Sequence, residues 1–455
     1  MIKQIFCFFC FALTFIACSS DSPTEPFNPQ PTDDDGQPTP TLTDQEIMDL
    51  TQRETFKYFW DYAESNSGAA RERYHIDNPS QDQNVVTTGG SGFGLMAILV
   101  GIQRGYVTRS EAVTRLQTIL DFFESADRFH GAWPHWINGA NGNVIPFSSL
   151  DNGGDIVETA LLAQGLICVK EYFKNGTPAE VQLADQADAL WKGVEWDWYT
   201  QGQNALYWHW SPNHGFSINL KLTGYNETLI AFVLGAASPD YPIPAEAYHQ
   251  GWASNGNIVS GNMQYGIPLI LKHAGSEQFG GPLFWAHYSY LGLNPTNLSD
   301  QYAYSYWDVN KNHTNINYQY CVVNPLGHTD YGPNCWGLTA SYSRNTDGSI
   351  GYFAHKPGND PGVISPTAAV SSIPYTPEKS LAAMHFFYQK NLMGPAGFYD
   401  AFSPRYNYWV ANAYLAIDQG PQIIMIENYR TKLLWNLFMQ NEDVQNGLDA
   451  LGFNY

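Results

Sequence analysis

Apolar residues in this chain gather in long segments separated by polar, glycine-rich stretches, and this pattern predicts an all-α protein. A helix that is apolar on every side is buried on every side. After Thr108 and Thr177, by contrast, apolar residues recur only at helical spacing, which predicts amphipathic helices with one face in solvent. Alternating buried and amphipathic helices are typical of an α/α barrel, in which an outer ring of helices encloses an inner ring. The segments that are apolar nearly all round are 92–103, 155–172, 226–236, 378–390, 407–417 and 421–440.

Several helix starts are marked by capping boxes, in which a threonine and the glutamate three residues later bond to each other's backbone N–H groups. Three such boxes are Thr43 to Glu46, Thr108 to Glu111 and Thr177 to Glu180. Thr177 and Thr376 are each followed by proline, which suits the first helical position because no backbone donor is needed there. We therefore expect helices to begin just after these threonines.

The segments between the predicted helices are rich in glycine and aromatic residues, as in 130–136, 206–211, 282–288 and 397–400. The region from about 300 to 375 is long and poor in helix signals. A long segment without regular structure inside a compact domain is usually functional. We expect this region to fold over one end of the barrel and to help form a cleft.

The N-terminal segment predicts export and a lipid anchor. An apolar run from Ile5 to Ala17 follows the single charge of Lys3 and is too short to span a bilayer, so residues 1–17 are predicted to be a signal peptide. Ala17, Cys18 and the polar residues after them resemble a bacterial lipoprotein cleavage site, which would leave Cys18 lipidated as the membrane anchor. The alternative is an ordinary signal peptide cut nearby. Either way, the proline- and aspartate-rich residues 18–42 predict a flexible tether, and 43–455 predict one domain.

Composition limits the partners of this domain. The net charge of -21 argues against nucleic acid and anionic membrane surfaces. Aromatic residues make up 15% of the chain, more than the 14% that is charged, and sugar rings stack on tryptophan and tyrosine faces. An acidic, aromatic-rich protein therefore suits a carbohydrate ligand, although a large aromatic core would give the same composition.

The cysteines of the predicted domain indicate no catalytic role. Cys168 lies in an apolar helical segment, which predicts a buried thiol. Cys321 and Cys335 lie close together in the region with few helix signals, and outside the cytoplasm they can form a disulfide. No pair of cysteines has the spacing of a zinc site, and we expect no metal.

Acidic residues stand at the ends of three apolar segments. Asp155 and Glu158 are three residues apart, so they share a face of the helix that begins there. Asp155 is equally well explained as an N-terminal cap, whereas Glu158 lies in a buried turn, where a charge needs a partner or a function. Asn226 is a candidate N-cap for the helix after it, which would make Glu227 a first-turn acid. Asp418 is predicted to end one helix just before Pro421 begins the next, and an acid at a helix C-terminus opposes the helix dipole.

Taken in chain order, these segments resemble the glycoamylase-like domain of glycoside hydrolase family 144 and, more distantly, of cyclic β-1,2-glucan synthases. The matching segments are 88–95, 151–159, 225–228, 416–421 and 426–430, and the resemblance covers 43–455. It implies an (α/α)6 barrel that needs no cofactor and hydrolyses β-1,2-glucans with inversion of the anomeric centre.

The resemblance also implies roles for individual residues. Glu227 resembles the general acid, Asp155 and Glu158 match essential acids, and Asp418 or Asp400 stands on the side of the base. These roles fit glycoside hydrolysis, in which one carboxyl protonates the leaving oxygen while another activates water. Candidates for substrate contact, each of which could equally be a packing residue, are Asp151, Arg71, Trp133, His135, Trp208, Trp210, Trp285 and Tyr288.

Two other functions remain open from the sequence. One is an α-glucan hydrolase, because sequence pattern alone does not separate α from β linkages. The other is an outer-membrane lipoprotein that captures glycans without cleaving them, although several acids at buried helix ends fit such a protein poorly. Endo and exo cleavage, and the periplasmic or outer face of the membrane, are not distinguished. We expect a monomer.

Overall fold

The computed structural model describes residues 41–276, 278–345 and 347–455, and helices dominate this part of the chain. The predicted signal peptide, Cys18 and nearly all of the tether lie outside these residues. No helix within them combines the length and the apolar character needed to cross a bilayer. The α-helices are α1 (Asp44–Trp60), α2 (Thr88–Arg104), α3 (Arg109–Ser125), α4 (Ile156–Phe173), α5 (Pro178–Lys192), α6 (Leu229–Ala237), α7 (Tyr306–Val323), α8 (Pro366–Val370), α9 (Pro377–Gln389), α10 (Ala416–Thr431), α11 (Leu433–Met439) and α12 (Glu442–Ala450).

The predicted helix starts are confirmed. Capping boxes are formed by Thr43, Thr108 and Thr177 before α1, α3 and α5, and Pro377 is the first residue of α9. In each box the glutamate satisfies the backbone N–H of the threonine, which would otherwise have no partner at the helix end.

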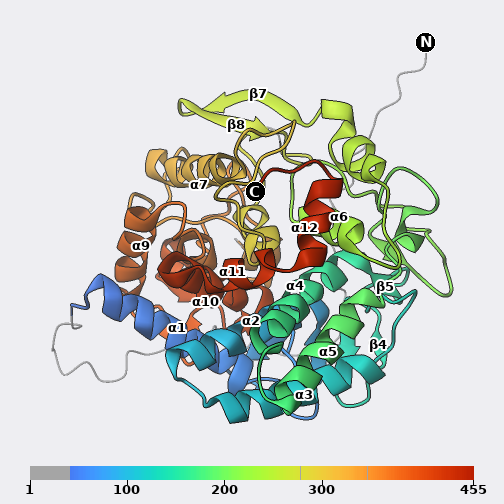
Figure 1. Ribbon diagram of the computed structural model, residues 1–455. Helices are drawn as coiled ribbons and strands as arrows, with labels where there is room; N and C mark the ends of the chain where they lie inside the picture. The colour runs from blue at the N-terminus through green and yellow to red at the C-terminus, as the bar shows by residue number, and fades with distance from the viewer. Residues whose placement is uncertain (1–40, 277, 346) are drawn as a thin grey trace.

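Buried helices pack against one another in the middle of the molecule. α2 packs between α4 and α10, and α4 also packs against α6 (Figure 1). Glycine allows the closest of these approaches, because a Cβ atom on Gly92 would lie 2.2 Å from the carbonyl oxygen of Leu161. The amphipathic helices α1, α3 and α5 lie outside this group, and each packs its apolar face against a buried helix or a neighbour.

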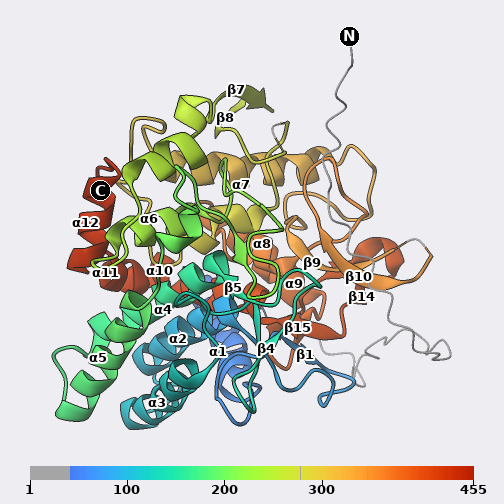
Figure 2. The same ribbon diagram turned by 90° about the vertical axis from the view of Figure 1, so that its right-hand side faces the viewer.

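Short strand pairs, which the sequence did not predict, occupy the segments between helices. In Figure 2, β1, β9, β10, β14 and β15 lie on one side of the molecule, while α2, α3, α5 and α12 lie on the other. One end of the helices is therefore covered by hairpins and loops, as expected, but these contain regular strands. The strands are β1 (Arg73–His75), β2 (Val85–Thr87), β3 (Trp136–Asn138), β4 (Val144–Ile145), β5 (Gly154–Asp155), β6 (His209–Trp210), β7 (Val259–Gln264), β8 (Ile267–Leu271), β9 (Ala340–Arg344), β10 (Ile350–Ala354), β11 (Met393–Gly394), β12 (Gly397–Phe398), β13 (Phe402–Ser403), β14 (Trp409–Val410) and β15 (Ala413–Leu415).

Two predicted elements differ in the structure. The predicted helix at 407–417 is wrong, because Asn407 and Tyr408 have φ angles of 53° and 56°, outside the right-handed helical region. The strands β14 and β15 follow, and they pair with β13 and β1. The region 300–375 contains the long helix α7, which was not predicted from the sequence. This helix contains many asparagines, and asparagine is a weak helix former. The hydroxyl of Ser305 caps α7 by accepting from the N–H of Asp308 at 3.0 Å.

The three cysteines in the described part of the chain are free thiols. Cys168 is buried in α4, as predicted. Cys321 and Cys335 are also buried and are not bonded to each other, so the disulfide that the sequence left open is not formed in this structure. Burial raises the pKa of the Cys168 and Cys321 thiols, which makes both unreactive at neutral pH.

Candidate active site

The candidate acids lie at the N-terminal ends of buried helices. Asp155 is the N-cap of α4, Glu158 lies in its first turn, and Glu227 stands just before α6. Asp418 lies in the first turn of α10, so its predicted place at a helix C-terminus is wrong, and its charge has the favourable orientation toward the helix dipole. The N-cap residue of α6 is Thr228, not Asn226 as the sequence suggested. The side-chain oxygen of Asn226 accepts from the Thr228 N–H at 3.0 Å.

Asp155 is both a helix cap and the centre of a hydrogen-bond network. Its Oδ1 accepts from the backbone N–H groups of Val157 at 3.0 Å and Glu158 at 2.9 Å. Its Oδ2 accepts from His135 Nδ1 at 2.8 Å and from Trp208 Nε1 at 3.1 Å. Burial opposes ionisation of Asp155, but hydrogen bonds from two histidines hold its pKa well below the ordinary range. Asp155 is therefore a permanent anion that orients the rings around it.

The second histidine is His209 on β6, which sequence analysis missed. Its Nε2 lies 3.0 Å from Asp151 and 3.5 Å from Asp155. Although burial disfavours the cation, these carboxylates raise the pKa of His209 to about 9, and nearby acids raise that of His135 to about 9 as well. Both imidazoles are therefore protonated at neutral pH. Oxygen and nitrogen atoms of His135, Asp151 and Asp155 lie close enough together to hold a metal ion, but a protonated imidazole donates hydrogen bonds and does not ligate.

Glu158 and Glu227 carry protons more readily than ordinary glutamates. Glu158 accepts from the N–H of Gly89, at the start of α2, at 2.8 Å, and burial raises its pKa. The Glu227 Oε2 atom is buried and has no hydrogen-bond partner among the described residues. Burial raises the pKa of Glu227 to about 7, and the negative charges of Glu158 and Asp155 add to this effect. Glu227 is thus an acid in equilibrium between both forms at neutral pH.

Asp400 and Asp418 form a second acidic group. Asp400 Oδ2 accepts from the Tyr342 N–H at 2.7 Å, whereas both oxygens of Asp418 are buried and, in the described part of the chain, have no other side-chain or backbone donor. Burial raises the pKa of Asp400 to about 6 and that of Asp418 well above its usual range, and the contact between the two carboxyls increases the rise for Asp418. Two carboxyls this close cannot both ionise readily, so the pair shares one proton near neutral pH.

Tyr288 lies between the two acidic groups. Its hydroxyl donates to the carbonyl of Ile417 at 2.9 Å. That carbonyl is free because Pro421, four residues later in α10, has no N–H to offer it. Burial raises the pKa of Tyr288 well above 10, and the negative charges of Asp418, Glu158 and Glu227 add to the rise.

The other residues predicted to contact substrate have different surroundings. Trp133 is 0% exposed, and its Nε1 donates to the Phe123 carbonyl at 2.9 Å, so the structure places it in the core. Arg71 is buried and holds the loop after β1 by donating to the carbonyls of Pro79 and Gln81. Trp285 is partly exposed, and its Nε1 is buried without a partner. Trp210 is also partly exposed and packs edge-on against His130.

Sequence analysis also missed polar residues beside Asp400 and Asp418. Glu72 contributes to the raised pKa of Asp418, and its carboxylate pairs with Arg73 at 2.7 Å. Arg73 in turn donates to the hydroxyl of Tyr342 at 2.8 Å. Tyr352 on β10 lies close enough to Asp418 and Asp400 for their negative charges to contribute to its raised pKa. Arg73, Tyr342 and Tyr352 lie on strands whose pairing no local pattern indicated, and Glu72 directly precedes one of them.

Comparison with known proteins places the chain in a family. Residues 219–442, which include Glu227, Asp400 and Asp418, match the Glycoamylase family, described as "Putative glucoamylase". The endo-β-1,2-glucanase of Chitinophaga pinensis, solved with sophorotriose and glucose, is 54% identical; the match covers 91% of this chain and 99% of that one, with a TM-score of 0.88. The chain belongs to the Glycoamylase family. The family resemblance predicted from the sequence is thereby confirmed.

Two other relatives of the family extend the comparison. A putative glucoamylase from Bacteroides fragilis is 55% identical, with 92% of this chain and 99% of that chain covered and a TM-score of 0.88. An exo β-1,2-glucooligosaccharide sophorohydrolase acting at the non-reducing end, from Parabacteroides distasonis, is 42% identical over 90% of this chain. The chain spans 58% of the length of that curated relative.

Proposed function

We propose that this protein is a glycoside hydrolase that cleaves β-1,2-glucan. The observation that carries the proposal is the pairing of one buried, unpartnered acid, Glu227, with a second group, Asp400 and Asp418, that shares a proton. Glycoside hydrolysis requires one carboxyl that gives a proton and another that receives one. The β-1,2 linkage is supported by the activities of the two glucan-cleaving relatives.

Glu227 is the general acid in this proposal. At a pKa of about 7 it still holds a proton near neutral pH, and none of the residues that the structure describes forms a hydrogen bond with its Oε2. A carboxyl with a pKa near the working pH transfers its proton most effectively to the leaving glycosidic oxygen. Asp155 and Glu158 keep this pKa raised, because a negative Glu227 would be repelled by their charges.

Asp400 and Asp418 form the base side. Because Asp400 has the lower pKa of the two, it is the member that is ionised first as the pH rises, while Asp418 keeps the shared proton. The ionised carboxylate accepts a proton from the water that attacks the anomeric carbon on the face opposite the leaving group. That geometry inverts the anomeric centre.

The mode of cleavage is proposed to be endo. The endo-acting relative is covered over 99% of its length at 54% identity, whereas the exo-acting relative is 42% identical and has a large part outside the match. The catalytic body of this chain therefore corresponds to the whole of the endo-acting protein.

We also infer that the helices close into the (α/α)6 barrel implied by the family resemblance. The first and last buried helices, α2 and α10, pack against each other, and α4 links α2 to α6. Between α6 and α8 the inner position is taken by two 3-10 helices, η4 (Leu283–Ala286) and η5 (Tyr288–Tyr290). Tyr375, just after α8, donates to the carbonyl of Ala286 at 3.1 Å, which supports this place in the ring.

The location of the protein is a separate proposal. We propose a monomeric lipoprotein of the outer membrane that is anchored through Cys18, because the polar residues after Cys18 and the apolar run before it have the order of a lipoprotein signal. Incorporation of labelled palmitate should occur in the wild-type protein and be lost in Cys18→Ser. Equal labelling of both proteins would contradict the anchor.

The substrate is tested by incubating the purified protein with β-1,2-glucan, sophoro-oligosaccharides and starch, and resolving the products by chain length over time. The proposal predicts a ladder of short β-1,2-linked oligosaccharides from the earliest samples. Sophorose alone at early times would contradict endo cleavage, and products from starch alone would contradict the linkage. Binding of β-1,2-glucan without any product would instead indicate a glycan-capturing protein.

A further inference from the structure

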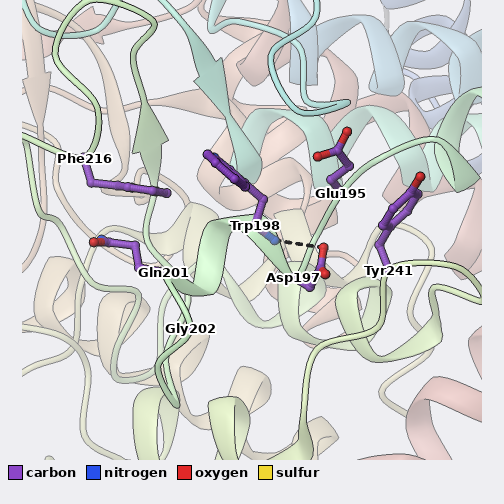
Figure 3. Close-up of a pocket in the computed structure, with 7 residues that line it drawn as sticks. All are labelled: Glu195, Asp197, Trp198, Gln201, Gly202, Phe216 and Tyr241. Carbon is purple, nitrogen blue, oxygen red and sulfur yellow. Dashed lines mark hydrogen bonds between the residues drawn. The ribbon is translucent and has the colours of Figure 1, made fainter.

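A hollow of about 340 Å³ lies on the flank of the molecule, outside the acidic groups described above. It forms around the 3-10 helix η1 (Trp198–Thr200), which follows α5. In Figure 3, Trp198 stands between Phe216 and Gln201 on one side and Glu195 and Tyr241 on the other. The remaining lining residues are Asp197 and Gly202.

Trp198 presents one aromatic face to this hollow. Its side chain is 41% exposed, which is unusual for tryptophan in a chain that buries most of its large aromatics. The imidazole of His130 stacks on one face of the indole, with ring centroids 3.6 Å apart and planes inclined by 13°. Trp210 packs edge-on against the same indole at 6.1 Å. The indole is therefore fixed in place by His130 and Trp210, while 41% of the Trp198 side chain stays exposed where it lines the hollow.

Polar side chains lie on both sides of Trp198 in this hollow (Figure 3). The Glu195 carboxylate is held by His130 Nδ1 at 2.9 Å, and Asp197 is held by the Trp198 N–H at 2.9 Å. Gln201 has a positive φ of 52°, and its side-chain Nε2 is buried without a hydrogen-bond partner among the described residues. An unpaired buried amide donor is costly unless a ligand or water accepts from it. Fixed carboxylate acceptors and a free amide donor next to an aromatic face suit the hydroxyl groups and ring of a sugar.

A second hollow adjoins the first at Tyr241. It measures about 530 Å³ and shares Tyr241, which is 37% exposed, with the hollow around Trp198. Its polar lining consists of three aspartates and one lysine, namely Asp185, Asp188, Asp240 and Lys192. Because both hollows are lined by Tyr241, we treat them as one surface, which we call the flank groove; Trp198 lines its first part and Tyr241 lines both parts. Two adjoining hollows suit consecutive units of a sugar chain rather than a single small molecule.

We propose that the flank groove is a second binding site for a neutral glucan chain, separate from the site of hydrolysis. Five acidic residues line it against one lysine, so an anionic ligand is disfavoured while a neutral polyhydroxyl ligand is accepted. The groove lies behind the strand pair β5–β6, because Trp210, which packs on Trp198, belongs to the strand that pairs with Asp155. The identity of the glucan as β-1,2-linked rests on the proposed function.

The flank groove would hold a distant part of a long chain while another part is cleaved. Long substrates should therefore depend on Trp198, and short ones, which cannot reach both places, should not. This difference in length dependence separates a second binding site from a structural role of Trp198, because a structural defect would affect all substrates alike.

The test compares Glu227→Gln with the double variant Glu227→Gln/Trp198→Ala on native gels containing long β-1,2-glucan. The affinity for the glucan, taken from the retardation at increasing glucan concentrations, should be about tenfold weaker for the double variant, the loss typical of truncating a tryptophan anchor. Trp198→Phe should restore most of it. Tyr429→Ala is the matched control, since Tyr429 is 40% exposed but does not line the groove, and it should leave retardation unchanged.

The second measurement is hydrolysis by Trp198→Ala in the otherwise wild-type protein. KM for the long glucan should rise several-fold, with kcat on it and all constants for a short oligosaccharide unchanged. Equal retardation with and without Trp198, or equal loss on short and long substrates, would overturn the second site. If wild-type protein cleaves no β-1,2-glucan while Trp198-dependent retardation persists, the proposed hydrolysis fails and the binding site stands.

Discussion

Replacing Glu227 by glutamine should increase stability at alkaline pH while removing activity. A rise of the Glu227 pKa from 4.5 to about 7 means that the folded protein disfavours the ionised carboxyl by about 3 kcal/mol, at ~1.4 kcal/mol for each tenfold change. Because the unfolded chain loses this proton first, the stability of the wild-type protein falls between pH 4.5 and 7 and then stays low. Glutamine carries no charge in either state, so the variant escapes this loss.

The assay is urea-induced unfolding of both proteins at pH 4.5 and pH 8. We expect nearly equal free energies of unfolding at pH 4.5, and a variant that is more stable by up to about 3 kcal/mol at pH 8. Hydrolysis by the variant should fall by about 10²- to 10⁴-fold, the usual contribution of a general acid. An aryl β-sophoroside should recover much of this loss, because a phenolate leaves without a proton.

The control for this prediction is Glu111→Gln. The capping hydrogen bonds of Thr108 lower the pKa of Glu111, so its stabilising effect is present at high pH and lost as the solution is acidified. The control should therefore be less stable than wild type at pH 8, the opposite sign to Glu227→Gln. A stability difference between Glu227→Gln and wild type that is the same at both pH values would refute the raised pKa and, with it, the assignment of the acid.

Three further predictions concern other parts of the molecule. The pH profile of kcat/KM should rise with an apparent pKa of about 6, set by Asp400, and fall with an apparent pKa of about 7, set by Glu227. In Asp400→Asn the rise of kcat/KM on the acidic side should disappear, and kcat should fall about 10²-fold. The control Asp347→Asn, on the exposed β9–β10 hairpin, should keep the wild-type profile. Gly92→Ala should reduce the free energy of unfolding by about 3 kcal/mol in urea titrations, because its Cβ would lie 2.2 Å from the Leu161 carbonyl; an unchanged midpoint would contradict the close contact of α2 and α4. Cys321 and Cys335 should react with a thiol reagent only after unfolding, and a dithiol reductant should leave the melting temperature unchanged; a lower melting temperature on reduction would indicate a disulfide.

Features written in local sequence were predictable. The capping boxes at Thr43, Thr108 and Thr177 involve residues three apart, so their pattern is visible without any tertiary contact. The apolar segments around α2 and α4 were also identified, because burial on all sides removes polar residues from every face. The acids Asp155 and Glu158 were found for the same reason, since each interrupts or begins such a segment.

Features that depend on pairing between distant segments were not predictable. The strands β14 and β15 are two and three residues long, too short to show alternation, and β15 pairs with the distant strand β1. This is why Asp418 was assigned to the wrong helix end. His209 gave only a weak signal, its place between two tryptophans, and its contacts with Asp151 and Asp155 depend on the pairing of β5 with β6.

The most direct test of the central claim is the anomeric form of the first product. Wild-type protein is mixed with β-1,2-glucan in an NMR tube, and the new reducing-end proton signals are followed before mutarotation equilibrates them. Hydrolysis by Glu227 as acid and the Asp400–Asp418 pair as base predicts that the α-anomer is formed first. Initial formation of the β-anomer would contradict the two-carboxyl inverting mechanism, and the absence of any new reducing end would contradict the activity itself.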